Sequence, residues 1–115
     1  MRRRTFLRLT AATVGVLAAR PARAEGIVKR EYKNGVKLSV IGFGGVVVVG
    51  MEQKEADWTV AKAFDRGVNY FDVAPSYFNG EAETKLGVAL EPYRKRTFLA
   101  CKTMARDAAG ARKEL

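Results

Sequence analysis

The sequence contains no histidine and a single cysteine, Cys101. One cysteine cannot form an internal disulfide. With no histidine to join it, that cysteine also cannot build a zinc site of the usual Cys/His kind. No apolar run reaches the roughly 20 residues that a membrane-spanning helix needs. These absences predict a protein without a metal site, without an internal cross-link and without stable membrane insertion.

The excess of positive charge is concentrated at one end of the chain. The formal net charge is +9 over 115 residues, and six arginines lie within the first 24 residues. Without those six, 15 basic residues stand against 12 acidic ones, a net charge of +3. No basic stripe with interleaved aromatic residues remains, which argues against a nucleic-acid partner.

Residues 1–24, MRRRTFLRLTAATVGVLAARPARA, have the layout of an export signal. A basic start is followed by an apolar middle over residues 9–19 and by a small-residue ending, Ala-Arg-Ala, at residues 22–24. The stretch RRTFLR resembles a twin-arginine signal. We therefore predict recognition by the twin-arginine export machinery, cleavage near Ala24 and a periplasmic mature protein. The alternative is a basic amphipathic helix that stays attached.

The mature part, residues 25–115, alternates between strand and helix patterns. Asn34-Gly35 lies between two short alternating runs and predicts a β-hairpin. After it, the pattern predicts strands over Leu38–Phe43, Val68–Phe71 and Thr97–Cys101, helices over Glu52–Arg66 and Glu81–Leu90, and a third helix capped by Asp107. This order is typical of an α/β protein with a parallel sheet and helical crossovers.

The glycine cluster Gly42-Phe43-Gly44-Gly45 after the first of these strands raises the possibility of a Rossmann dinucleotide-binding loop. The Rossmann fingerprint needs a third small residue at the position that Val47 occupies, and a helix that begins at once. Here the chain instead continues through the apolar residues 46–49. The simpler interpretation is that the glycines allow a tight turn at the end of the strand.

Three segments together resemble the aldo-keto reductases: GFGG at residues 42–45, GVNYFDVAPSYFNGEAETKLG at 67–87 and FLACKT at 98–103. The resemblance implies a (β/α)8 TIM barrel that binds NADPH without a Rossmann domain. It also implies reduction of aldehyde or ketone carbonyls by hydride transfer. Residues 25–115 would supply the N-terminal hairpin and about three of the eight βα units.

The resemblance also implies site residues. Asp72, Tyr77 and Lys102 match three members of an Asp–Tyr–Lys–His tetrad, and the histidine has no match in this sequence. All three would open onto the rim where the strands of such a barrel end. There Tyr77 would act as general acid, an ammonium group would favour release of the phenolic proton, and a carboxylate would orient that ammonium. Taken singly, each residue could instead be an ordinary surface or loop residue.

The cofactor is expected to lie against the first strand end. By the same resemblance Gly44, Gly45 and Val46 would contact NADPH, and Asp72 would lie near its nicotinamide ribose. A nucleotide-binding barrel subunit or redox sensor with little catalysis is the alternative function, and a non-functional truncated product is another.

A complete barrel needs about 250 residues, so the sequence also predicts a truncated protein. We expect the 115-residue chain alone to show no measurable reductase activity and to fold poorly. A cooperative thermal transition of the isolated chain in circular dichroism would contradict the second of these expectations.

Overall fold

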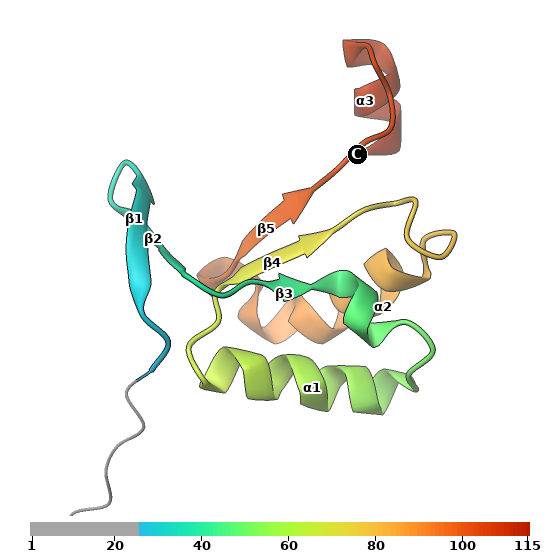
Figure 1. Ribbon diagram of the computed structural model, residues 1–115. Helices are drawn as coiled ribbons and strands as arrows, with labels where there is room; N and C mark the ends of the chain where they lie inside the picture. Colours follow the sequence, from blue (N-terminus) through green and yellow to red (C-terminus); the bar gives the residue numbers. More distant parts are fainter. Residues whose placement is uncertain (1–25) are drawn as a thin grey trace, which may run out of the picture.

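The computed structural model describes residues 26–115 (Figure 1). The predicted export signal therefore lies outside the described residues. Within them, no helix is long and apolar enough to cross a membrane. The elements are the strands β1 (Lys29–Lys33), β2 (Val36–Ser39), β3 (Phe43–Gly44), β4 (Tyr70–Val73) and β5 (Phe98–Cys101), the α-helices α1 (Gln53–Asp65), α2 (Glu81–Leu90) and α3 (Ala108–Glu114), and the 3-10 helices η1 (Gly45–Val48) and η2 (Glu91–Arg96).

The predicted hairpin is confirmed. Strands β1 and β2 pair in antiparallel fashion, and the turn between them places Asn34 at φ 51° and Gly35 at φ 79°. Two consecutive left-handed residues are what a type I′ turn requires, and Asn-Gly is the dipeptide that tolerates them best.

The predicted parallel sheet is also confirmed. It has three strands in the order β3-β4-β5, with β3 parallel to β4 and β4 parallel to β5. Helices α1 and α2 cover one face of this sheet, while the hairpin stands at the end where the strands begin (Figure 1). The strands of this sheet therefore have the same order in space as in the sequence, as expected for successive βα units wound in one direction.

The core lies between the sheet and helices α1 and α2. Phe71 and Val73 of β4 point into it, and Ala56 and Val60 of α1 are buried against them. From α2, four residues are buried in the core: Ala82, Leu86, Ala89 and Leu90. The structure confirms α2 over the predicted residues Glu81–Leu90, and the chain continues directly into the 3-10 helix η2, whose first turn contains Pro92.

Two predicted strands were placed wrongly. The segment from Leu38 to Phe43 is not one strand, because the chain leaves β2 at Ser39 and enters β3 only at Phe43. The Ser39 hydroxyl donates to the Ile41 carbonyl at 2.7 Å. This local hydrogen bond turns the chain out of the extended conformation that strand pairing requires. The second predicted strand begins two residues late, at Tyr70, because the backbone amide of residue 69 is bonded to the Ser39 hydroxyl instead.

Residues 46–49 also differ from the prediction. No helix was expected directly after the glycine cluster, whereas a 3-10 helix begins at Gly45 and runs to Val48. The β-branched residues there gave a strand-like pattern. Burial of Val48 in the core, with Val46 and Val47 exposed, matches a turn of helix instead.

Asn69 holds the hairpin against the sheet. Its side-chain oxygen accepts from the Ser39 amide at 2.7 Å, and its side-chain nitrogen donates to the Lys37 carbonyl at 2.8 Å. Its backbone carbonyl accepts from the Phe98 amide at 2.7 Å. One residue thus joins β2, the start of β4 and β5.

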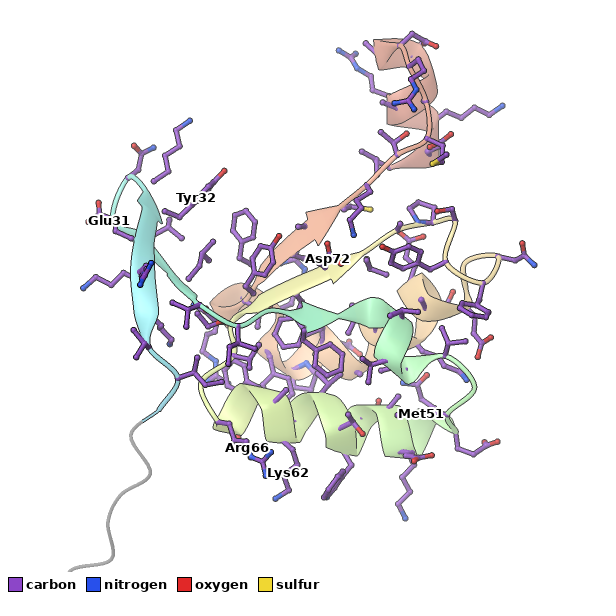
Figure 2. All side chains as sticks on the ribbon, in the orientation of Figure 1. Glu31, Tyr32, Met51, Lys62, Arg66 and Asp72 are labelled. Carbon is purple, nitrogen blue, oxygen red and sulfur yellow. The ribbon has the colours of Figure 1, made fainter. Side chains whose placement is uncertain are left out.

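Aromatic rings fill the space between the hairpin and the sheet face that α1 and α2 do not cover. The Tyr70 and Phe98 rings are stacked, with centroids 5.8 Å apart. Tyr32 of the hairpin meets the Phe98 ring edge-on at 5.7 Å and lies on the side of the hairpin that faces β5 (Figure 2). The hairpin therefore covers the end of the sheet opposite to the one where the strands finish.

We predict that Asn69→Ala destabilises the whole protein by about 1–3 kcal/mol, because the buried Ser39 amide loses its partner. The free energy of unfolding in urea measures this. Thr84→Ala, at an exposed position of α2, is the control and should lie within about 0.5 kcal/mol of the wild type. An Asn69→Ala variant as stable as the control would show that the two side-chain hydrogen bonds of Asn69 are not needed to hold the hairpin.

Candidate active site

The alternation of side chains along β4 sends Asp72 to the face of the sheet opposite the helices. Phe71 and Val73 are buried beneath the sheet, so the residue between them points the other way (Figure 2). Gly44 is its register partner on β3, and Ala100 is its partner on β5. The Asp72 side chain keeps about a quarter of its surface accessible, at 26%.

Tyr77 reaches the same place from the loop that follows β4. Pro75 ends the extended chain, and the Tyr77 amide then closes a turn by donating to the Ala74 carbonyl at 3.0 Å. The Tyr77 ring packs against the edge of the hydrophobic core, which fixes the direction of its hydroxyl.

Lys102 contacts both Asp72 and Tyr77. It directly follows β5, and its Nζ lies 2.5 Å from Asp72 Oδ2. The same Nζ donates to the Tyr77 hydroxyl at 3.0 Å and lies 5.0 Å from the centroid of the Tyr77 ring. The structure therefore places the three predicted tetrad residues in direct contact, with the ammonium between a carboxylate and a phenol.

The contact with Asp72 keeps Lys102 charged. The hydrogen bond to the Asp72 carboxylate, followed by the one to Tyr77, raises the pKa of Lys102 above its ordinary value. A raised pKa favours the protonated form, so the lysine stays cationic throughout the physiological pH range. Half of its side chain is exposed, at 50%, and solvent therefore weakens the ion pair.

The glycines at the end of β3 differ in their surroundings. A side chain on Gly44 would point to the same face as Asp72, and its Cβ would meet only a Val46 methyl group at 3.9 Å. The space over Gly44 is therefore open, and Val46 beside it is 47% exposed. Gly45 is buried, and a Cβ there would lie 2.8 Å from Val73, so packing alone explains its lack of a side chain.

The open space over Gly44 lies next to Asp72 and is lined by backbone and by the exposed Val46 side chain. A flat group bound there could contact Gly44, Val46 and Asp72, whereas buried Gly45 can offer only its backbone. Among residues 26–115, no group of His, Cys, Asp and Glu side chains could hold a metal ion.

A second polar cluster supports the loop that carries Tyr77. Glu81 at the start of α2 accepts from the Gly50 amide at 2.8 Å and pairs with Lys85 at 2.8 Å. Lys85 Nζ also donates to the Met51 carbonyl. The Lys85 hydrogen bond, followed by the Gly50 bond, lowers the pKa of the Glu81 carboxyl. The sequence analysis did not find this cluster, although the i,i+4 spacing of glutamate and lysine was visible.

The chain matches the aldo/keto reductase family over residues 40–115. The chain belongs to the aldo/keto reductase family. Its three parallel βα units are accordingly part of a (β/α)8 barrel, as the sequence predicted. The rim of such a barrel where the strands finish is the site of chemistry in this fold, and Asp72, Tyr77 and Lys102 all lie there.

Two relatives with different descriptions are similar to part of this chain. The aldo-keto reductase YhdN of Bacillus subtilis is 36% identical over 76 residues, which are 60% of this chain and 23% of YhdN. A protein described as a probable voltage-gated potassium channel subunit beta, from Arabidopsis thaliana, is 42% identical over 66 residues, 52% of this chain and 20% of that protein.

A solved structure agrees with the fold. A protein from Pseudomonas aeruginosa, assigned to the aldo-keto reductases, superposes with a TM-score of 0.67 at 25% identity. The match covers 82% of this chain and 42% of that one. The chain therefore spans about a fifth of the length of the curated relatives above and less than half of this solved structure.

Proposed function

We propose that the whole protein is an NADPH-dependent oxidoreductase that reduces the carbonyl group of an aldehyde or ketone. The observation that carries this proposal is the position of the Lys102 ammonium, 2.5 Å from the Asp72 carboxylate and 3.0 Å from the Tyr77 hydroxyl. A hydroxyl in contact with a fixed cation is suited to give up a proton to an acceptor that becomes negatively charged during the reaction.

NADPH, when bound, supplies the hydride that adds to the carbonyl carbon. The carbonyl oxygen then carries negative charge and needs a proton. Tyr77 donates its hydroxyl proton to that oxygen and is left as a phenolate. Lys102 stabilises the phenolate through the hydrogen bond already present, and Asp72 keeps the lysine charged and pointed at Tyr77. The fourth tetrad position has no counterpart in this chain, which contains no histidine.

The test is a turnover assay with the purified whole protein, NADPH and benzaldehyde. We expect loss of NADPH absorbance that depends on the aldehyde, and formation of one benzyl alcohol for each NADPH consumed. Titration of NADPH alone, followed by the quenching of protein fluorescence, reports cofactor binding separately. Absence of both binding and turnover would remove the proposed function.

A second candidate is a nucleotide-binding subunit or redox sensor with little catalysis. The similarity to a protein described as a probable potassium channel subunit beta favours it. The same pair of measurements separates the two candidates, since a sensor binds NADPH tightly but consumes it at a negligible rate.

A further inference from the structure

Charged residues are divided unevenly over the part of the chain that the structure describes. Three segments lie where the strands of the sheet begin: the hairpin (residues 29–39), the end of α1 (residues 62–66) and η2 (residues 91–96) (Figure 1). We call these segments together the basic surface. They carry nine basic and three acidic residues, a net charge of +6. The other residues between 26 and 115 carry six basic and eight acidic ones, a net charge of −2.

Contacts between the three segments make the basic surface continuous. The Ile27 amide donates to the Arg66 carbonyl at 3.2 Å, which joins the start of the hairpin to the end of α1. The Arg96 guanidinium lies 4.7 Å from the centroid of the Phe64 ring, which joins η2 to the same end of α1. The edge-on contact of the Tyr32 ring joins the hairpin to β5, the strand that η2 leads into. The excess of positive charge therefore belongs to one region of the protein.

The basic residues of this surface are not neutralised by acidic neighbours. Among residues 26–115 the ion pairs are Lys85–Glu81 and Lys102–Asp72, and neither includes a residue of the basic surface. All nine of its basic residues are exposed. Like charges held close together repel one another, and an anionic partner removes that repulsion while gaining attraction of its own. The basic surface is therefore suited to bind an anionic partner.

The fold keeps this surface accessible in a complete barrel. The end of α1 and η2 are connections from a helix to the next strand, and in a (β/α)8 barrel such connections form the face where the strands begin. Further βα units continue the ring beside β3 and β5, the two outer strands of the sheet, and so do not cover that face. The candidate active site lies at the opposite ends of the strands.

The aromatic residues within the basic surface favour a membrane over a nucleic acid as the partner. Nucleic-acid grooves present free aromatic rings on which bases stack. Here the Phe64 and Tyr93 rings stack on each other, with centroids 4.5 Å apart, and Arg96 lies over Phe64. The basic residues come from three elements around one end of the barrel, which matches a broad anionic surface. Anionic phospholipid headgroups form such a surface and attract each nearby lysine or arginine.

We propose that the basic surface binds the face of a membrane that contains anionic phospholipids. The attraction is between exposed charges, so it requires no segment to enter the bilayer and is screened by salt. Asp72, Tyr77 and Lys102 lie at the other ends of the strands. In the bound protein the candidate active site therefore faces away from the lipid and stays open to solvent. The inference does not depend on the proposed reductase function.

The experiment measures co-sedimentation of the whole protein with vesicles of phosphatidylcholine, alone or mixed with phosphatidylglycerol. At low salt we expect the partition coefficient to be about 10-fold or more higher for the anionic vesicles, and to fall to the value for neutral vesicles at high salt. The double variant Lys33→Glu/Lys95→Glu reverses one exposed charge on the hairpin and one on η2. It should lower the partition coefficient for anionic vesicles about 10-fold or more.

Lys54→Glu/Lys113→Glu is the matched control. It changes the net charge by the same amount at two exposed lysines outside the basic surface, and should bind anionic vesicles within about twofold of the wild type. Far-ultraviolet circular dichroism verifies that both variants are folded. Equal weakening in the two variants overturns the inference, because net charge alone would then explain binding. A wild-type protein that ignores anionic vesicles but binds DNA at the same salt concentration overturns it as well.

Discussion

Replacing Tyr77 with phenylalanine should lower kcat for benzaldehyde reduction in the whole protein by about 10²–10⁴-fold, the usual contribution of a general acid. Phenylalanine retains the ring that packs against the core and removes only the hydroxyl that contacts Lys102. NADPH binding, measured by fluorescence quenching, should change by less than about twofold, because in the proposed mechanism the hydroxyl acts on the carbonyl oxygen of the substrate and not on the cofactor.

Tyr93→Phe is the control for this change. Tyr93 is also partly buried against the core, where its ring stacks on Phe64 with centroids 4.5 Å apart, and it lies in η2 on the helix side of the sheet. Its variant should keep the wild-type kcat. A Tyr77→Phe protein that turns over at the wild-type rate would remove Tyr77 from the mechanism and leave water or another group as the proton donor.

Replacing Lys102 with methionine should lower kcat by about 10²–10³-fold, the size of effect seen when one group that stabilises developing charge is removed. The ammonium lies between the Asp72 carboxylate and the Tyr77 hydroxyl, and methionine is of similar length but carries no charge. Without it, the Asp72 carboxylate faces Tyr77 unshielded and opposes formation of the phenolate. Lys95→Met, at an exposed position of η2, is the control and should keep the wild-type rate.

The Lys102→Met variant also tests how the stability of the fold depends on pH. Because the pKa of Lys102 is raised in the folded protein, its contribution to stability is complete below the unfolded value of about 10.4 and is lost as pH rises through the folded value. The wild type should therefore lose stability above about pH 10.4 relative to Lys102→Met. Parallel alkaline unfolding curves of the two proteins would show that the Asp72 contact does not stabilise the fold.

The helices and the chemistry could be predicted from the sequence because their signals are local. The spacing of apolar residues, an acidic first turn and a stop signal were enough to place α2 at its observed bounds. Asp107 was predicted to cap α3, and its side chain accepts from the Gly110 amide at 2.8 Å. The choice of Asp72, Tyr77 and Lys102 came from the resemblance to the aldo-keto reductases, and their placement together came from the rule that the ends of neighbouring parallel strands meet at one edge.

The parts that could not be predicted depend on contacts between distant residues. The late start of β4 follows from the bonds between Ser39 and the residue 30 positions later, which no local pattern contains. At Gly45, where the 3-10 helix begins, Val73 of β4 occupies the space that a Cβ atom would need, and no local pattern contains this contact. The positive φ of Phe78 could not be predicted, because phenylalanine rarely adopts the left-handed backbone conformation.

The contacts of Asn69 with β2, β4 and β5 restrict which side chains can occupy position 69. The side chain must accept from one amide and donate to one carbonyl at once, at a fixed short reach from the backbone. Aspartate would turn a second oxygen toward the Lys37 carbonyl, serine has one atom where two are needed, and glutamine is one carbon too long. Both partners of this side chain are backbone groups, so a change of side chain at residues 37 or 39 cannot compensate for a change at position 69. Only a change in the path of the segment that joins the hairpin to the sheet could do so.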